Sequence, residues 1–489
     1  MENALYRDSL LSKSEENILS KDVEDPKSQQ EIDKEEKFYE EIIGKSIHTR
    51  NRIFVFICAF FVYLAYGKEM TIFNLIIKPV GNYFDLEESG LKIQIITSSV
   101  FLGVAIGSMV SSFITLKIGR IYTINLANII STIANVVMSI YLNYIVFTIC
   151  RFFVGFAFGN IIPLLINILA EYCPIKFRGF LLMLCWSFYA VGALVSCLIG
   201  YKVMPNLEEE KLQEFLFILI SLPSLSLISC LLLLKDGPKF RFISNYKKTM
   251  NEENINESKN EILEEIKKLE NTKNTITTKQ IFNEMFNPEL KKTTILLLII
   301  FASIGYNAFG IYSISSYFLD YLDEKENGKK TDDIKPENEE RDIYINQMMN
   351  AVSYFGMVIL GGILGDVKKI GRKGGIIIFN IIATVSTVLG IFKKILFEFT
   401  SPISFGSTST FISLVMDYVV ELYPTKIRDN SSGILFSVFK ISCFIYNYVC
   451  MGFYNVYEYI PYFIYIFFSI VVCILIILLP YEMAGKHMN

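Results

Sequence analysis

The sequence predicts an all-α membrane protein in which twelve transmembrane helices form two six-helix repeats. The 489 residues are 52% hydrophobic and 14% aromatic, and the mean hydropathy is +0.41, which is more apolar material than a soluble core of this size buries. Apolar runs long enough to cross a hydrocarbon layer of about 30 Å recur twelve times. The motif Glu-x-x-Pro-x-Lys-x-Arg occurs twice, beginning at Glu171 and at Glu421, which indicates a duplicated unit.

A second pair of markers puts the two halves in register. Gly119 and Arg120 precede the first motif by nearly the same number of residues as Gly371 and Arg372 precede the second. Each motif also lies between two apolar runs. The same short basic connection therefore joins equivalent helices in both halves.

The chain divides into five parts. We expect a polar, disordered tail at 1–52 without a cleavable signal peptide, a first bundle at 53–234, a cytosolic loop at 235–293, a second bundle at 294–480 and a tail at 481–489. In the loop, apolar residues at helical spacing predict a short amphipathic helix: Ile262, Leu263, Ile266 and Leu269. The predicted spans are 53–77, 93–116, 122–141, 145–171, 180–201, 213–234, 294–320, 343–365, 375–395, 399–421, 432–456 and 459–480.

Basic residues in the short connections predict the orientation. Lysine and arginine gather in alternate loops, around Arg120, Arg178, Arg372 and Arg428, and such loops face the cytosol. We therefore expect both termini in the cytosol. The plasma membrane is favoured over an internal membrane.

Several classes of function are excluded by composition. A net charge of −3 gives no basic field for nucleic acid, and no Gly-rich phosphate loop points to ATP-driven transport. Nine cysteines and two histidines lack metal-ligand spacing, so we expect no metal, no cofactor and no disulfide framework. No nucleophile and base arrangement indicates an enzyme, and we expect a monomer whose partners are the lipid bilayer and a small-molecule substrate.

Local motifs resemble the major facilitator superfamily, in the branch of organic-ion, sugar and synaptic-vesicle-type transporters. The similar segments are Arg151-x3-Gly155-x3-Gly159 with the first Glu-x-x-Pro-x-Lys-x-Arg-Gly motif, Lys235 to Phe240, and Pro480-x-Glu482. The resemblance covers 53–486. It implies the major facilitator fold and secondary transport by alternating access.

This chain departs from the family pattern at two places. The first helix has Tyr66 where relatives often have aspartate, although Glu69 matches. The loop after the second helix has Leu116 in place of the family's aspartate, whereas the second half retains Asp366. The resemblance therefore predicts gating by these loops less firmly than it predicts the fold.

Ionisable residues within apolar spans are the candidates for chemistry, because each costs about 2.5 to 3.5 kcal/mol at a helix centre on insertion scales. We expect Lys440 to attract a substrate anion, the alternative being a lysine that reaches the interface. Glu69 is predicted to couple protons or to form a structural ion pair. Lys68 is a further candidate for binding the substrate. It points about 100° away from Glu69, so we expect the two not to pair. The resemblance implies a coupling role for Arg151, for which a buried pair is the alternative.

Polar and aromatic residues at helical spacing complete the predicted site, with plain packing as the alternative. The wall candidates are Trp186, Tyr306, Asn307, Tyr312 and Asn447. Charged residues around the basic loops predict a cytosolic gate, in which Glu171 and Glu421 pair with arginines when the cavity faces outward and lose those pairs when it opens inward. The gate candidates are Arg120, Glu171, Arg178, Asp366, Arg372, Glu421 and Arg428.

These observations predict a transporter of a small organic anion, such as pantothenate or nicotinate, moved together with a proton. Three alternatives remain: facilitated sugar uptake, transport of an organic cation, and a receptor or vesicle protein of the same fold that binds a ligand without moving it. Sugar is disfavoured by the family resemblance, because sugar carriers usually have paired glutamines and an asparagine in the seventh helix, whereas this chain reads Tyr306-Asn307-Ala308-Phe309-Gly310 there.

Overall fold

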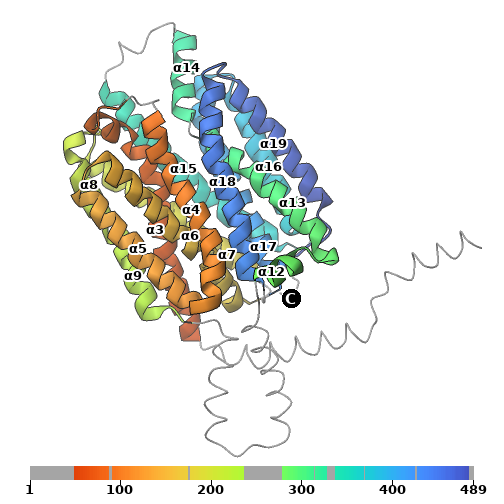
Figure 1. Ribbon diagram of the computed structural model, residues 1–489. Helices are drawn as coiled ribbons and strands as arrows, with labels where there is room; N and C mark the ends of the chain where they lie inside the picture. The colour runs from red at the N-terminus through yellow and green to blue at the C-terminus, as the bar shows by residue number, and fades with distance from the viewer. Residues whose placement is uncertain are drawn as a thin grey trace, which may run out of the picture.

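The computed structural model describes residues 49–86, 91–174, 177–235, 278–312, 314–327, 336–367, 369–424 and 427–483. These residues are nearly all helical and include no strand. Twelve helical stretches are long and apolar enough to cross a membrane, and they run side by side in one bundle (Figure 1). The predicted fold class is confirmed. Residues 1–48 of the predicted N-terminal tail and the amphipathic helix predicted near Ile262 lie outside the described residues, whereas residues 49–52 of that tail are the start of the first helix.

The first half contains six spans. Its helices are α3 (Thr49–Tyr83), α4 (Leu91–Ile118), α5 (Arg120–Ile140), α6 (Tyr144–Tyr172), α7 (Arg178–Val203), the turn η2 (Glu209–Lys211), α8 (Leu212–Leu219) and α9 (Ser221–Leu233). The sixth span is interrupted between α8 and α9. Pro223 lies in the first turn of α9 and has no N–H for the carbonyl four residues earlier.

The second half repeats this order. Its helices are α12 (Thr278–Met285), α13 (Pro288–Gly305), the π-helical turn η3 (Tyr306–Gly310), α14 (Ser315–Asn327), α15 (Pro336–Asp366), α16 (Gly371–Gly390), α17 (Lys394–Leu422), α18 (Arg428–Tyr454) and α19 (Ile460–Leu478). The seventh span starts at Pro288, a residue suited to a helix start. It therefore begins before residue 294 and is not one continuous helix to residue 320.

Two glycines build the same turn in both halves. Gly119 has φ 85° immediately before α5, and Gly371 has φ 67° at the start of α16. This left-handed conformation is open to glycine at little cost and strained for other residues. The arginine that follows each glycine is thereby held at the same end of its half.

Glycines also bring α4 and α6 into close contact. A Cβ atom on Gly103, Gly107, Gly155 or Gly159 would overlap the backbone of the facing helix. Small residues at this spacing let two membrane helices approach closely. Gly155 and Gly159 of α6 therefore let α4 approach closely.

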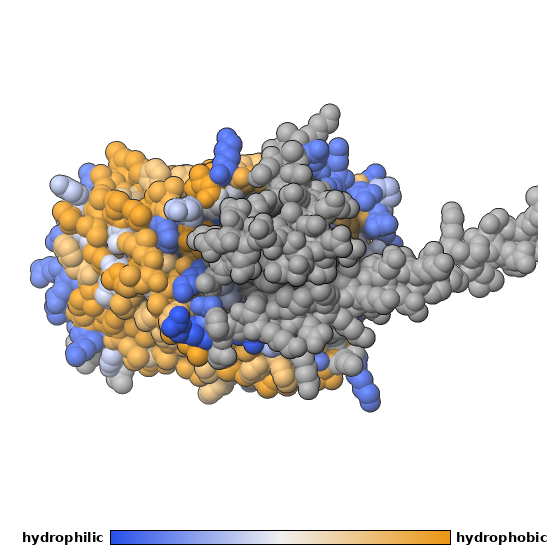
Figure 2. Space-filling view, turned by 90° about the horizontal axis from the view of Figure 1, so that it is seen from below, coloured by the Kyte–Doolittle hydropathy of each residue, from blue (hydrophilic) through white to orange (hydrophobic). Residues whose placement is uncertain are grey.

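The two halves meet where α4 packs on α18 and α7 packs on α15, and α4 and α18 lie side by side in Figure 1. The outer surface is apolar: viewed from below in Figure 2, hydrophobic side chains cover much of the visible rim. Exposed hydrophobic residues such as Ile133, Leu231 and Phe467 contribute to this surface. Such a rim suits contact with lipid.

Candidate functional site

Lys440 of α18 is buried at the interface of the two halves, with 2% of its surface exposed. Its Nζ lies 4.5 Å from the ring centroid of Phe439, 4.8 Å from Phe309, 5.4 Å from Phe436 and 5.6 Å from Phe101. We call these four rings the phenylalanine cage. Among the described residues no carboxylate forms an ion pair with Lys440. Cation–π contacts are worth about 0.5 to 2 kcal/mol each, so the cage stabilises the charge without neutralising it.

Both halves of the protein contribute to the cage. Phe101 comes from α4 in the first half, and its ring lies 4.5 Å from that of Phe309 in the second. Phe309 belongs to η3, and π-helical turns often occur at functional sites because they displace a side chain from the regular helical register. The sequence analysis did not identify these phenylalanines, since aromatic residues in apolar spans are too common to stand out.

Tyr306 and Asn307 of η3 point toward α19. The Tyr306 hydroxyl donates to the carbonyl of Pro461 at 2.9 Å, and Asn307 Nδ2 donates to Ser469 Oγ at 3.0 Å. Both side chains are fully buried. These contacts hold η3 in place, and thus position Phe309, while a direct role in substrate binding stays a prediction.

Tyr312 and Asn447 lie on other elements of the second half. The Tyr312 hydroxyl is 3.4 Å from Ser404 Oγ and 3.5 Å from Thr408 Oγ1 of α17. Asn447 is buried on α18, two turns after Lys440 and hence on the same helix face. Asn447 is therefore the wall candidate best aligned with the cage.

Lys68, Glu69 and Arg151 form one buried ionic cluster in the first half. Lys68 Nζ donates to Glu69 Oε1 and, at 2.8 Å, to Asn135 Oδ1. Arg151 Nη1 lies 3.2 Å from Glu69 Oε2, and no more than 1% of any of these three charged side chains is exposed. Glu69 thus has two cationic partners, which supports the structural ion pair over proton coupling.

The prediction that Lys68 and Glu69 do not pair is wrong. The Cα–Cβ bonds of sequence neighbours diverge by about 100°, but the flexible four-carbon stem of lysine lets its ammonium turn back. Both groups are cut off from water, so pairing compensates for the hydration that each has lost.

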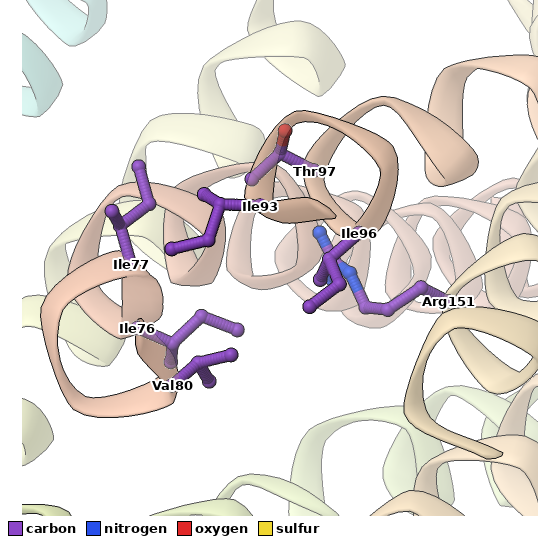
Figure 3. A pocket seen from close by; sticks show the side chains of 7 residues that line it. All are labelled: Ile76, Ile77, Val80, Ile93, Ile96, Thr97 and Arg151. Carbon is purple, nitrogen blue, oxygen red and sulfur yellow. The ribbon is translucent and has the colours of Figure 1, made fainter. Parts of the chain in front are cut away.

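Arg151 also borders a small pocket between α3 and α4 (Figure 3). The other lining residues are Ile76, Ile77, Val80, Ile93, Ile96 and Thr97. Within the part of the chain that the structure describes, Nε and Nη2 of Arg151 have no hydrogen-bond partner. The pocket is almost wholly apolar apart from this guanidinium.

Trp186 lies at the interface of the halves and bonds a residue that the sequence analysis missed. Its Nε1 donates to Oδ1 of Asp417 in α17 at 3.3 Å, and its ring lies 4.9 Å from that of Tyr63. Asp417 is fully buried. An ionisable residue inside an apolar span is the signal that identified Glu69 and Lys440, so this carboxylate could have been found from sequence in the same way.

At one end of the bundle, Arg120 joins the two halves. We call this end the loop end; it is the lower end in Figure 1, where α12 lies. Arg120 Nη1 is 2.6 Å from Glu171 in the same half, and its Nε is 2.5 Å from Asp429 at the start of α18. Asn167 Nδ2 also donates to Asp429, at 2.9 Å. Asp429, which was not predicted as a gate residue, is therefore the carboxylate that connects the halves here.

Arg372 is the equivalent arginine of the second half. It makes two hydrogen bonds to Glu421, of 3.0 and 2.9 Å, and an ion pair of 2.9 Å to Asp366. The other oxygen of Asp366 accepts from the backbone N–H of Phe180 in the first half, at 2.9 Å. Glu171 and Glu421 thus pair with arginines of their own halves, and Asp429 and Asp366 make the contacts between halves.

The remaining gate candidates are buried at the loop end. Arg178 begins α7 and is 4% exposed, whereas Arg428 begins α18 and is 0% exposed. Arg428 Nε donates to the carbonyl of Tyr423 at 3.1 Å. A state-dependent role for these arginines stays a prediction.

The opposite end of the bundle is also bridged. Ser98 Oγ lies 2.6 Å from the hydroxyl of Tyr448, and the Tyr344 hydroxyl donates to the carbonyl of Met204 at 2.8 Å. Both bonds join one half to the other. The two halves are therefore in contact at both ends, with the phenylalanine cage between them.

Comparison with known proteins gives matches along most of the chain. Residues 55–318 match the family model described as sugar (and other) transporter. The cis,cis-muconate transport protein of Acinetobacter baylyi is 22% identical over 410 residues, which cover 81% of this chain and 86% of that protein. Organic cation/carnitine transporter 7 of Arabidopsis thaliana is 23% identical, with 90% of this chain and 93% of that protein covered.

Two further matches concern a segment and the fold. The niacin transporter NiaP of Acinetobacter baylyi is 30% identical over 111 residues, or 23% of this chain and 25% of that protein. The solved structure of the proton:xylose symporter XylE, bound to 6-bromo-6-deoxy-D-glucose, has a TM-score of 0.68 at 14% identity and covers 90% of this chain and 98% of that one. The XylE likeness establishes the shared fold.

Proposed function

The chain belongs to the sugar (and other) transporter family of the major facilitator superfamily, and on that premise we propose that it moves a small organic anion by alternating access together with a proton. The observation that carries this proposal is the unneutralised Lys440 in the phenylalanine cage. A buried ammonium without a protein carboxylate attracts an anion strongly, because little water screens it. The site is at the interface of the two halves, where carriers of this kind bind their cargo.

The cage favours a carboxylate attached to a flat apolar body. The ammonium would bind the carboxylate, and the four phenyl rings would pack on the rest of the molecule. Nicotinate fits this description better than pantothenate, whose body is flexible and polar. Two relatives named for muconate and niacin transport support this class of cargo. An organic cation would meet the like charge of Lys440.

The contacts at both ends support a closed intermediate of alternating access. Opening at the loop end requires the Arg120–Asp429 ion pair to break, and opening at the other end requires the Ser98–Tyr448 bond to break. Each set lies on a different side of the cage. One set can therefore separate while the other remains.

The proposal includes an orientation and a location. The loop end faces the cytosol, because the basic connections gather there, and both termini lie on that side. The protein acts as a monomer in the plasma membrane. Accessibility of tags at the two termini in intact cells would test the orientation.

Transport by purified full-length protein in liposomes would test the function. The panel is radiolabelled nicotinate, benzoate, pantothenate, a hexose and an organic cation, each with and without a pH gradient. We expect an aromatic acid to accumulate when the outside is acidic, and Lys440→Met to abolish this uptake. Uptake of the hexose without any of the acids would overturn the proposal.

A further inference from the structure

Asp417 is a fully buried carboxylate at the interface of the two halves. It lies one helical turn before Glu421 in α17 and has 0% of its surface exposed. Its Oδ1 accepts the bond from Trp186 of α7, in the other half. Its Oδ2 has no hydrogen-bond partner among the described residues. One oxygen is therefore available for a proton.

No cation of the described residues forms an ion pair with Asp417. The charged groups that act on it are Arg372, Glu421 and Asp366, and Arg372 already pairs with the other two carboxylates. The other titratable groups that face it are Tyr63 of α3, Tyr354 of α15, Cys185 of α7, and Cys173 after α6. Three carboxylates thus surround a single guanidinium, and a buried charge without compensation is costly.

The repeat supplies a comparison for this position. The residue 250 positions earlier, at the equivalent place in α6, is Asn167, which donates to Asp429 and Ser432 of the opposite half. The equivalent position of the first half is therefore occupied by a neutral amide side chain. The ionisable group at Asp417 is not required by the fold of this helix pair.

Glu69 differs from Asp417 in its partners. Glu69 bonds both Lys68 and Arg151, so protonating it would leave two buried cations without their anion. Protonating Asp417 would leave no cation unpaired. Of the two buried carboxylates, Asp417 is the one that can gain and lose a proton with little disturbance of its neighbours.

We propose that Asp417 is the proton-binding site of the transport cycle, protonated while the loop end is closed and deprotonated when α7 and α17 separate there. When Asp417 takes up a proton from water, one O–H bond forms at Oδ2. When Asp417 releases the proton to water, that bond breaks. The inference rests on the proposed proton-coupled transport. It assigns the coupling role to Asp417 in place of Glu69.

Full-length protein in liposomes tests this with nicotinate and benzoate as probes. One proton moved per monovalent anion across one pH unit sustains about tenfold accumulation. We expect wild type to approach this ratio. Asp417→Asn should retain acid exchange without a gradient but lose the accumulation, and Asp417→Glu should restore it.

The matched control is Glu69→Gln. The fraction of this variant that folds should still accumulate the acid when a pH gradient is applied. Should Asp417→Asn fail to fold, Trp186→Phe serves instead, because it removes the N–H donor to the carboxylate and keeps an aromatic ring at this position. Its pH profile of uptake should then move to more alkaline pH, and an unchanged profile would contradict the inference.

The two proposals fail in different ways. If the wild-type protein transports neither nicotinate nor benzoate, the proposed function is refuted. If wild type accumulates an acid and Asp417→Asn accumulates it equally, the transport proposal stands and the role of Asp417 is refuted.

Discussion

Replacing Asp429 with asparagine should favour opening at the loop end. Asp429 accepts from Arg120 at 2.5 Å and from Asn167 at 2.9 Å, and asparagine has only one acceptor oxygen for these two donors. Hydrogen bonds to charged groups contribute about 1.5 to 3 kcal/mol. A free-energy change of about 1.4 kcal/mol changes an equilibrium constant tenfold. Losing one of these hydrogen bonds should therefore raise the population that is open at the loop end by about ten- to a hundredfold.

Cys173 offers a native probe of this opening. It follows α6 at the loop end and is 7% exposed, and burial raises the pKa of its thiol to about 12. At pH 8 the reactive thiolate is therefore scarce in the closed state. Once water reaches the thiol, its pKa should fall toward the ordinary value of about 8.5. Maleimide labelling at pH 8, quantified at Cys173 by mass spectrometry, then reports the open population.

Glu171→Gln is the matched control, because Glu171 bonds the same arginine at 2.6 Å but lies in the same half. It should raise the labelling rate less than Asp429→Asn does. Equal effects of the two variants would refute the assignment of Asp429 as the residue that joins the halves. So would a folded Asp429→Asn protein whose Cys173 reacts at the wild-type rate.

Three further variants test the buried charges and the helix packing. Glu69→Gln leaves Arg151 without its carboxylate partner, and breaking a buried pair costs about 3 to 5 kcal/mol, so the melting temperature in detergent should fall; an unchanged melting temperature would contradict the ion-pair role. Lys440→Met removes a buried charge that pairs with no carboxylate among the described residues, so thermal stability should hold or rise while protection by added nicotinate disappears; retained protection would exclude Lys440 from the site. Gly155→Val forces α4 and α6 apart and should cost about 1 to 3 kcal/mol of stability, whereas Gly452→Ala, which meets nothing within 4 Å, should be neutral; equal melting temperatures would count against the close packing.

The architecture could be predicted from sequence because the bilayer restricts the choices. Spanning segments must be helical and about twenty apolar residues long, so counting apolar runs was enough to find the bundle. The repeated turn was visible as Gly119-Arg120 and Gly371-Arg372, because its positive φ requires glycine. The interruption at η3 left no comparable mark, since Gly305 and Gly310 alone do not specify a π-helical turn.

The candidate site was less predictable because it depends on side-chain direction. Lys440 was found by its charge, but the rings around it come from three separate segments. Sequence spacing also suggested that Lys68 and Glu69 diverge, whereas burial makes them pair. The gate arginines could be predicted as a group from their place in the basic loops, whereas the residues that they contact across the interface depend on how the halves pack.

The differences between the repeats indicate where transport chemistry is concentrated. Equivalent positions of the two halves are 250 residues apart in the sequence. At three such positions, Lys440 corresponds to Ala190, Asp417 to Asn167 and Asp429 to Gly179. Arg372 packs directly on Gly179, whereas Arg120 bonds Asp429, so the two halves close by different means. The lysine that we propose to attract the anion and the carboxylate that we propose to bind the proton each occur only once among these three pairs. We therefore expect one proton per anion in each cycle, and a measured ratio of two would require a second proton-binding group that this interface does not supply.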